Sequence, residues 1–287
     1  MSTQIKDMRT PPFQWICSIQ TSYDRKVRLS PDKPLDSEGY THFGTGVLIT
    51  ERHVLTCAHN VSAVYQYKGK WLSKKPVEIR VKVGRNDEGY SVKPFWYRAK
   101  LPAAVSGLFG NYRTNKDQDA LRELAVIELK SPIGEKKFVK SGKRLKVGWW
   151  SSAYMSYIRP VEGSFKTALR KKKINVCGYP GDADPGGQND TTAGIPVSEF
   201  VSVAGVGTDT RPLLTFYATM GNGQSGGPVW VVDRNTKKRY LVAVYFGRDN
   251  NTGAQLGRLI TPDVINQLEN WGIQRHKLSL SQTPSVA

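Results

Sequence analysis

The 287-residue sequence has little cysteine and no long apolar run. Its three cysteines, Cys17, Cys57 and Cys177, are widely spaced and form no Cys-x-x-Cys pair. The odd number and the wide spacing exclude a disulfide framework, and the missing pair excludes the usual cysteine-based zinc sites. We therefore expect buried free thiols in a reducing, intracellular compartment, and neither a metal nor a cofactor.

The features that direct a chain into or across a membrane are also missing. No run of about 18 apolar residues is present, which predicts that the chain has no transmembrane helix. The segment Met1–Thr10 lacks the apolar core of a secretory signal peptide. A cytoplasmic location is expected, while secretion by a non-classical route stays open.

Acidic residues are few: 24 Asp and Glu stand against 42 Lys and Arg, which gives a net charge of +18. Many of the basic residues gather in the segments 136–146, 170–173 and 237–239. A positive surface attracts nucleic acid, anionic membranes or acidic proteins. Aromatic residues do not alternate with these charges as they would in a stacking platform, so a basic surface that serves only solubility is the alternative. The sequence does not indicate an oligomeric state.

Short strand-like segments separated by turn residues make up most of the chain. They are Phe13–Ile19, Phe43–Ile49, His53–Cys57, Val77–Val83, Leu124–Leu129, Lys173–Cys177, Glu199–Ala204, Leu213–Tyr217, Val229–Val232 and Tyr240–Phe246. One helix is predicted near the end, where Thr261 and Pro262 form a helix start and Gly272 a stop. Many short strands with little helix favour an all-β sandwich or barrel.

The strands fall into two halves joined by a lysine-rich connection, which favours two barrels with a cleft between them. The predicted divisions are an N-terminal mobile tail (1–12), a first barrel (13–135), a linker (136–150), a second barrel (151–262), a C-terminal helix (263–273) and a tail (274–287).

A serine stands among four glycines in Gly221-Asn-Gly-Gln-Ser225-Gly-Gly227-Pro-Val. Such a turn presents a hydroxyl outward, and the amides of Gly223 and Ser225 converge as an oxyanion hole requires. A glycine-rich hairpin before a buried strand is the other interpretation. A serine also needs a base, and of the four histidines only His59 lies at the end of a predicted hairpin, where a structural role is the alternative.

Two motifs resemble those of the trypsin-like serine proteases. Gly44-Thr-Gly-Val-Leu-Ile followed by Val54-Leu-Thr-Cys-Ala-His59 is similar to the hairpin that carries the base, which in the family reads Leu-Thr-Ala-Ala-His or a close variant. The Ser225 turn is similar to the nucleophile turn, and the two motifs come in the family's order. Gly178-Tyr-Pro-Gly-Asp182 and Gly257–Val264 resemble the V8-like, or glutamyl endopeptidase, branch.

The resemblance implies two six-stranded antiparallel β-barrels with a C-terminal α-helix, and a serine endopeptidase that acts on a peptide or protein substrate. It implies that Ser225 is the nucleophile and His59 the base. The family's aspartate is replaced here by Glu123, which we favour as the third member, with Asp119 as the alternative acid. A catalytically weak or inactive protease-fold protein that binds nucleic acid or an acidic partner is the competing hypothesis.

The resemblance also places Thr219, Tyr245 and Gly247 in the substrate pocket. Glutamyl endopeptidases have a histidine where Tyr245 stands, and trypsin-like enzymes with basic specificity have an aspartate where Thr219 stands. The family pattern therefore supports neither an acidic nor a basic preference.

Overall fold

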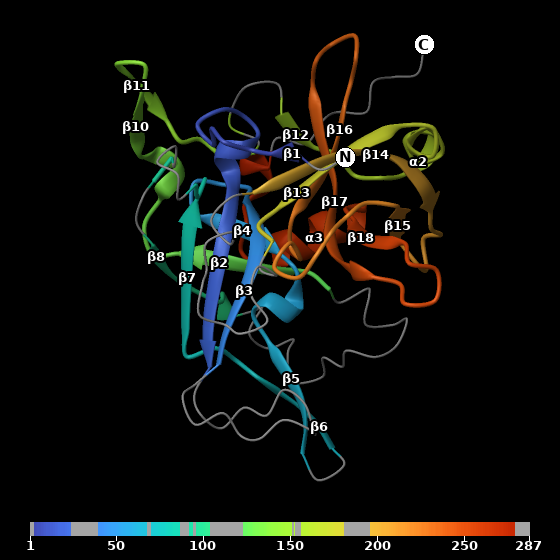
Figure 1. Ribbon diagram of the computed structural model, residues 1–287, viewed down its shortest axis with the longest axis horizontal. Coiled ribbons are helices and arrows are strands. Elements are labelled where there is room, and N and C mark those ends of the chain that lie inside the picture. The colour runs from blue at the N-terminus through green and yellow to red at the C-terminus, as the bar shows by residue number, and fades with distance from the viewer. Residues whose placement is uncertain are drawn as a thin grey trace.

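The computed structural model describes residues 3–23, 40–67, 70–86, 92–93, 96–103, 123–150, 152, 156–180 and 196–278. Two β-barrels lie side by side, with the first on the left of Figure 1 and the second on the right. None of the helices in these ranges is long and apolar enough to cross a membrane.

The first barrel is a closed ring of six antiparallel strands. In ring order they are β2 (Ile16–Tyr23), β3 (Tyr40–Leu48), β4 (His53–Thr56), β9 (Ala125–Leu129), β8 (Tyr97–Lys100) and β7 (Glu78–Val83). Strand β7 closes the ring by pairing with β2, with Val83 opposite Cys17. Inward-facing residues alternate with outward-facing ones, as in β7, where Ile79, Val81 and Val83 are buried.

The second barrel also closes as a six-stranded antiparallel ring, because β14 pairs with both β13 and β15. Its strands are β13 (Lys173–Gly178), β14 (Val197–Val206), β15 (Leu213–Phe216), β18 (Gln255–Leu259), β17 (Arg239–Arg248) and β16 (Pro228–Val232). Two short strands join this sheet from outside the ring: β1 (Thr3–Gln4) on β14, and β12 (Ser156–Ile158) parallel to β17. The predicted pair of six-stranded antiparallel barrels is confirmed.

The predicted C-terminal helix is present as α3 (Pro262–Asn270), with the proline in its first turn. Helix α2 (Gly163–Leu169) was not predicted. It is only two turns long and buries Phe165 and Leu169, which lie four positions apart on one face. So short a helix has too few apolar positions for a helical period to be recognised in the sequence.

Two segments that the sequence analysis predicted to be a tail and a linker contain strands. In the N-terminal segment, β1 pairs with β14 and Met8 is fully buried. In segment 136–150, β10 (Lys137–Lys140) and β11 (Lys143–Lys146) form a hairpin. Ser141 and Gly142 turn that hairpin with positive φ values of 50° and 75°. A second hairpin, β5 (Ala63–Tyr67) with β6 (Lys70–Lys74), extends from the first barrel (Figure 1).

Aromatic packing joins the two barrels. The Trp150 ring lies 5.8 Å from the Trp15 ring, next to β2, and 5.7 Å from the Trp230 ring on β16 of the second barrel. The Trp150 indole also donates a hydrogen bond of 3.0 Å to the Tyr157 carbonyl oxygen. The apolar core is therefore continuous across the seam between the barrels.

Candidate active site

Strand pairing brings His59 and Glu123 together. Strands β4 and β9 are antiparallel, with Thr56 opposite Ala125. His59 follows β4 by three residues, in the short 3-10 helix η2 (Ala58–Asn60), and Glu123 precedes β9 by two. Because the end of one strand lies beside the start of the other, both side chains reach the same edge of the barrel.

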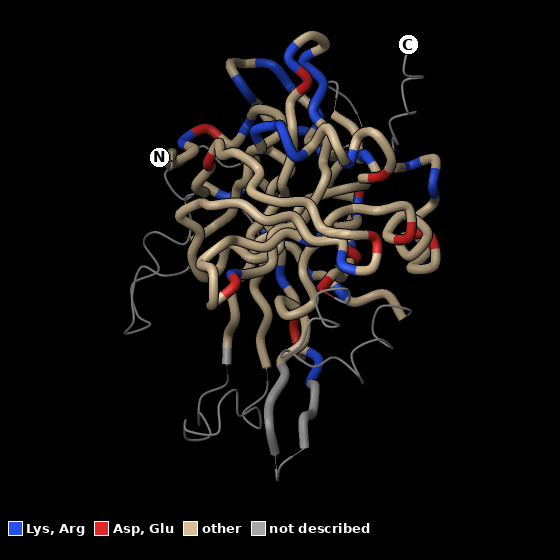
Figure 2. Tube along the Cα trace, turned by 90° about the vertical axis from the view of Figure 1, so that its right-hand side faces the viewer, with Lys and Arg blue, Asp and Glu red and all other residues tan. Residues whose placement is uncertain are grey.

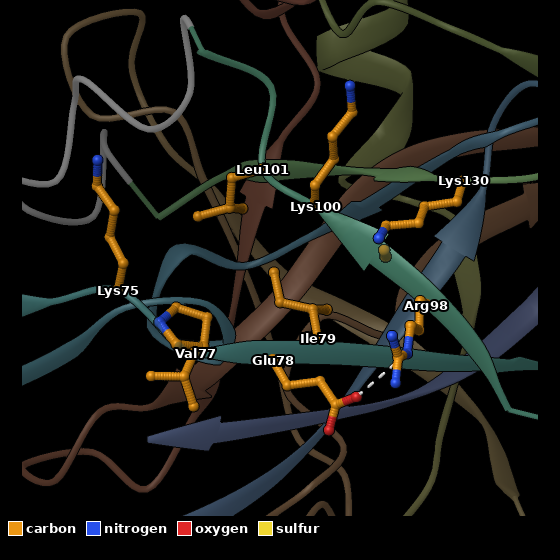
Figure 3. A pocket seen from close by; sticks show the side chains of 10 residues that line it. Lys75, Val77, Glu78, Ile79, Arg98, Lys100, Leu101 and Lys130 are labelled. Atoms are coloured by element: carbon orange, nitrogen blue, oxygen red, sulfur yellow. Dashed lines mark ion pairs between the residues drawn. The ribbon is translucent and has the colours of Figure 1, made fainter. Parts of the chain in front are cut away.

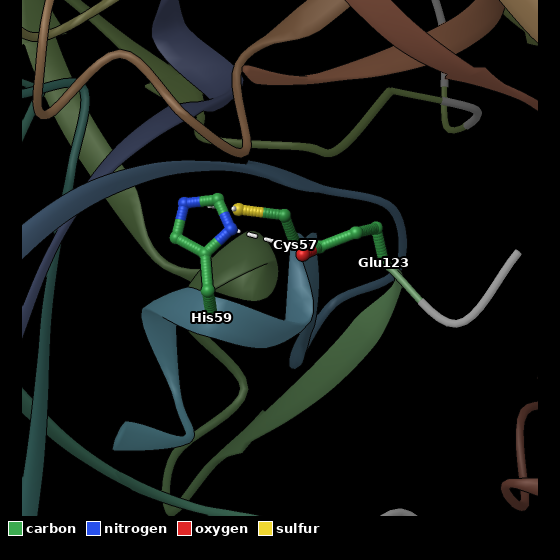
Figure 4. Close-up of side chains that lie close together, drawn as sticks. All are labelled: Cys57, His59 and Glu123. Carbon is green, nitrogen blue, oxygen red and sulfur yellow. Dashed lines mark hydrogen bonds and ion pairs between the residues drawn. The ribbon is translucent and has the colours of Figure 1, made fainter. Parts of the chain in front are cut away.

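His59 Nδ1 lies 3.1 Å from Glu123 Oε2, and Figure 4 shows the Glu123 carboxylate and the Cys57 sulfur close to the imidazole. The Glu123 side chain is 10% exposed and that of His59 is 26% exposed. An imidazole whose Nδ1–H donates to a carboxylate is held in the tautomer in which Nε2 carries the lone pair that accepts a proton. Here Nε2 also lies 3.5 Å from Cys57 Sγ. The candidate acid Asp119 lies outside the described residues.

Burial of the His59 ring favours the neutral form, but its interactions with Cys57 and Glu123 outweigh burial and raise the pKa of His59 well above the usual value. Burial raises the pKa of the Cys57 thiol. The nearby His42 behaves oppositely: burial, followed by the repulsion of His59, lowers its pKa to about 4. A carboxylate beside an imidazole stabilises its protonated form, which is what a general base needs after it has accepted a proton.

The Ser225 turn lies between β15 and β16 and depends on glycine. Gly226 has a φ of +90°, and a Cβ at that position would overlap the Thr45 carbonyl oxygen of the first barrel. Its amide donates to the Tyr245 carbonyl oxygen at 2.7 Å. The turn thus lies directly against the other barrel because residue 226 has no side chain.

Hydrogen bonds from the first barrel hold this turn. The Thr45 amide donates to the Ser225 carbonyl oxygen at 2.8 Å, and the Thr45 hydroxyl donates to the Gly223 carbonyl oxygen at 2.8 Å. The Asn60 side-chain amide also donates to the Ser225 carbonyl oxygen, at 2.7 Å. Since Asn60 follows His59 directly, these contacts bring the Ser225 turn beside the helix that carries the imidazole.

Sequence reasoning missed the role of Asn60. Its amide also donates to the Thr56 hydroxyl at 2.9 Å, and its Oδ1 lies 3.0 Å from His42 Nε2. Because an amide oxygen only accepts, the imidazole of His42 donates from Nε2, and this fixes the orientation of Asn60. Gly44 makes room, since a Cβ there would overlap the Asn60 side chain. The pairing of Gly44 with a polar residue after His59 is the only sequence indication of this contact.

The Ser225 hydroxyl donates to the Phe246 carbonyl oxygen at 3.4 Å. Within the described ranges, no hydrogen bond joins Ser225 to His59, and the amides of Gly223 and Ser225 have no acceptor. Gly223 has a φ of +80°, which turns its amide in a way that few other residues tolerate. The two amides predicted to form the oxyanion hole therefore have no other hydrogen-bond acceptor among the residues that the structure describes.

The three predicted pocket residues differ in exposure. Thr219 is exposed and Gly247 is half-buried, with open space where a Cβ would stand. Tyr245 is buried, and its hydroxyl donates to Gln255 Oε1 at 2.9 Å. The Tyr245 ring also packs 6.3 Å from Phe216, so this side chain belongs to the core of the second barrel.

Sequence reasoning also missed Glu199, a buried acid on β14. Its carboxylate oxygens accept the Thr219 amide at 3.1 and 3.0 Å. The Glu199 carboxyl group therefore lies beside the backbone of Thr219, the residue predicted at the base of the pocket. The only indication in the sequence is that a glutamate stands at an inward-facing position of a strand, where charged residues are rare.

The first barrel also has a cavity of about 450 Å³ that contains none of these residues (Figure 3). Lys75, Arg98, Lys100 and Lys130 line it together with Glu78, which lies 3.6 Å from Arg98. Figure 3 shows these charged side chains around the apolar Ile79. With no histidine or nucleophile in its lining, this cavity is separate from the candidate active site.

No protein-family model and no curated protein matches the sequence. Solved structures do match the fold. A Glu endopeptidase superposes with a TM-score of 0.59 at 18% sequence identity, over 93% of this chain and 94% of that chain. The protease Anisep from Arthrobacter nicotinovorans gives a TM-score of 0.53 at 12% identity, over 94% of this chain and 98% of that chain.

A thermostable serine protease, AL20, from an extremophilic microorganism also gives a TM-score of 0.53 at 12% identity, over 90% of this chain and 95% of that chain. These likenesses cover nearly the whole of each chain, and at such identities they concern the fold. The chain therefore has the double-barrel fold of the chymotrypsin-like serine proteases, which it shares with Glu endopeptidase.

Proposed function

We propose that this protein is a serine endopeptidase with Ser225 as nucleophile, His59 as base and Glu123 as the orienting acid. The observation that carries the proposal is the 3.1 Å contact between His59 Nδ1 and Glu123 Oε2. His59 lies on the same short helix as Asn60, whose side-chain amide donates to the Ser225 carbonyl oxygen. These contacts support a site at the seam between the barrels to which both barrels contribute.

In this mechanism the Ser225 hydroxyl turns from the Phe246 carbonyl toward His59 Nε2 by rotation about its Cα–Cβ bond. Hydrogen bonds in unliganded sites are often loose and tighten when substrate binds. The serine oxygen attacks the peptide carbonyl carbon, and the imidazole accepts its proton and gives it to the leaving amine. The amides of Gly223 and Ser225 stabilise the oxyanion, and water then hydrolyses the acyl-enzyme.

The proposed substrates are peptides or proteins, as for the Glu endopeptidase and the other proteases that share the fold. Glutamate preference does not transfer to this chain, because the Glu199 carboxylate beside Thr219 repels an acidic side chain. The same carboxylate favours a lysine or arginine before the scissile bond.

Labelling with a fluorophosphonate probe tests the nucleophile. We expect the wild-type protein to be labelled and Ser225→Ala to remain unlabelled, because the probe reacts only with an activated serine. Ser164→Ala, which changes an exposed serine on α2, is the matched control and should be labelled as fully as the wild type. Absence of labelling in folded wild-type protein would contradict the proposed activity.

A second candidate function is nucleic-acid binding, favoured by basic residues that gather at one end of the molecule. Figure 2 shows Lys and Arg concentrated at its top, where the β10–β11 hairpin and the β16–β17 turn lie. Nearby on the second barrel, a groove of about 610 Å³ contains Lys171, Lys172, Lys173 and Arg234 beside Phe200.

The Phe200 side chain is 55% exposed, and Lys173 Nζ lies 5.3 Å from its ring centre. This lysine and this aromatic ring are 27 positions apart in the sequence. A search for aromatic residues that alternate with basic residues along the chain therefore does not find the contact. An exposed ring among cations is a place where a nucleic-acid base stacks.

Binding of single-stranded DNA at low and moderate salt tests this candidate. We expect binding at low salt that weakens steeply as salt rises, and a further loss in Phe200→Ala. Asp233 also borders the groove, so Asp233→Asn should strengthen binding. If low salt gives no binding, the basic surface serves solubility alone.

A further inference from the structure

A pocket of about 290 Å³ on the second barrel combines an apolar wall with positive charge. It lies beside helix α2 and strands β16 and β17. Phe165, Val231 and Tyr240 are buried side chains of its wall, and Arg159 and Lys172 supply the positive charge. The pocket contains no residue of the candidate active site, so it has a role of its own to explain.

The Arg159 side chain is held in place by aromatic rings. Its backbone amide, directly after β12, donates to the Leu241 carbonyl oxygen at 3.1 Å. The guanidinium carbon lies 3.6 Å from the centre of the Phe165 ring on α2 and 5.1 Å from that of the Tyr240 ring on β17. A guanidinium that stacks on rings keeps the N–H donors at its edge available. These donors are therefore pre-organised before any ligand arrives.

The Arg159 guanidinium also lacks an anionic partner. Within the part of the chain that the structure describes, its side chain takes part in no hydrogen bond and no ion pair. The residue is half-buried, and this burial lowers the pKa of Arg159, while Tyr240 and Asp233 act in the opposite direction. A cation that has lost part of its hydration is stabilised when an anion binds to it. The pocket therefore favours a ligand with a negative group.

Size and charge narrow the ligand to a small carboxylic acid. Pockets for small molecules typically enclose about 300–1,000 Å³, so this one accepts a single ring or a short chain. The guanidinium fork matches the two oxygens of a carboxylate. Asp233 also lines the pocket and opposes a second negative charge, which favours a carboxylate over a phosphate, whose charge is close to −2.

We propose that this pocket binds a small aryl or alkyl carboxylate, with its carboxylate on the Arg159 guanidinium and its apolar body against Phe165 and Val231. The proposal depends neither on the peptidase function nor on nucleic-acid binding. The groove that contains Phe200 borders the pocket and shares Lys172 with it, but that groove contains neither Arg159 nor the buried apolar wall.

Isothermal titration calorimetry of the full-length protein with phenylacetate, and with its neutral amide, tests the pocket. We expect the wild type to bind the acid at least about tenfold more tightly than the amide, because charge-assisted hydrogen bonds from Arg159 act only on the acid. Arg159→Gln should bind the acid as weakly as the amide. Arg234→Gln makes the same change of charge at an exposed residue outside this pocket, and its affinity should stay within about twofold of the wild type.

Two further variants test the position of the ligand. Ala168→Trp places a large ring at an exposed position of α2 in the pocket wall and should block the acid. Phe200→Ala changes only the neighbouring groove and should leave the affinity unchanged. Circular dichroism verifies that each variant folds, and Ala168→Trp decides the question even if Arg159→Gln does not fold.

Three results would overturn the proposal. The first is that the wild type does not bind phenylacetate at millimolar concentration. The second is that the acid binds equally well to the wild type and to a folded Arg159→Gln or Ala168→Trp variant. The third is that phenyl phosphate binds more tightly than phenylacetate, which would remove the assignment to a carboxylate.

Discussion

At the scale of single residues, Glu123 differs from the aspartate of the family pattern by one methylene group. The sequence left two acids, Glu123 and Asp119, that could contact His59. A glutamate reaches the imidazole only if its backbone lies about one methylene length farther away than that of an aspartate. The structure brings the Glu123 carboxylate to 3.1 Å from His59 Nδ1. The extra length is accommodated, since Glu123 is the second residue before β9 and remains buried.

We predict that Glu123→Gln lowers kcat/KM by about 10²–10⁴-fold, because an amide does not stabilise the protonated imidazole. Steady-state peptide hydrolysis measures the loss. Asp119→Asn should stay within about twofold of the wild type. A larger loss in Asp119→Asn than in Glu123→Gln would make Asp119 the orienting acid.

A second prediction concerns Glu199. We expect a peptide library to show cleavage after Lys or Arg in preference to Glu, and Glu199→Gln to reduce that preference by about tenfold. The reason is the buried carboxylate that accepts the Thr219 amide at the predicted base of the pocket. Glu162→Gln, an exposed acid before α2, controls for the change in net charge. An unchanged preference in Glu199→Gln would remove Glu199 from substrate selection.

At the scale of elements, the strands that could be predicted are those with apolar residues at alternate positions or in short runs. Strands β7, β9, β16 and β17 have such patterns because one or both of their faces lie in a barrel. The β10–β11 hairpin is rich in lysine and mostly exposed, so burial imposes no pattern on it. Its two strands pair through backbone hydrogen bonds and a tight turn, and these features leave little pattern in the amino-acid sequence.

The contact between Asn60 and the Ser225 turn leads to a prediction for Asn60→Ala. The substitution removes the donor to the Ser225 carbonyl oxygen and the partner of His42. We expect the free energy of unfolding to fall by about 1–3 kcal/mol, because buried groups lose their hydrogen bonds. We also expect kcat to fall about 10–100-fold in protein that is still folded, because the nucleophile is no longer held in position.

Urea denaturation and kinetics at a temperature well below unfolding measure the two effects of Asn60→Ala separately. Asn251→Ala, at an exposed loop position, should change neither quantity. If Asn60→Ala is less stable but retains the wild-type kcat, Asn60 supports only the fold and does not position Ser225.

At the scale of the whole molecule, the three tryptophans at the seam join the two barrels into one core. We predict that Trp150→Ala lowers the free energy of unfolding by about 3–5 kcal/mol, since a fully buried indole leaves a large cavity. Phe200→Ala, which removes an exposed ring, should cost about 0.5 kcal/mol or less. Equal effects of these two substitutions in urea denaturation would show that the seam contributes little to stability.

The sequence predicted which side chains form the candidate site better than how they are held. His59 and Glu123 are predicted from motifs that resemble those of the trypsin-like serine proteases, each beside a strand with a clear apolar pattern. The contacts of Thr45 and Asn60 with the Ser225 turn join residues more than 160 positions apart, so no local pattern records them. Only the closure of both barrels brings these groups within hydrogen-bonding distance.

This distance along the chain has a consequence for the protein during its synthesis. A chain leaves the ribosome from its N-terminus, so the first barrel, with His59 and Glu123, emerges before residue 225 has been made. The Ser225 turn contacts the first barrel only when the second barrel packs against the first and Asn60 binds the Ser225 carbonyl oxygen. A chain that ends before residue 225 therefore lacks the proposed nucleophile, and the proposed activity depends on completion of the second barrel.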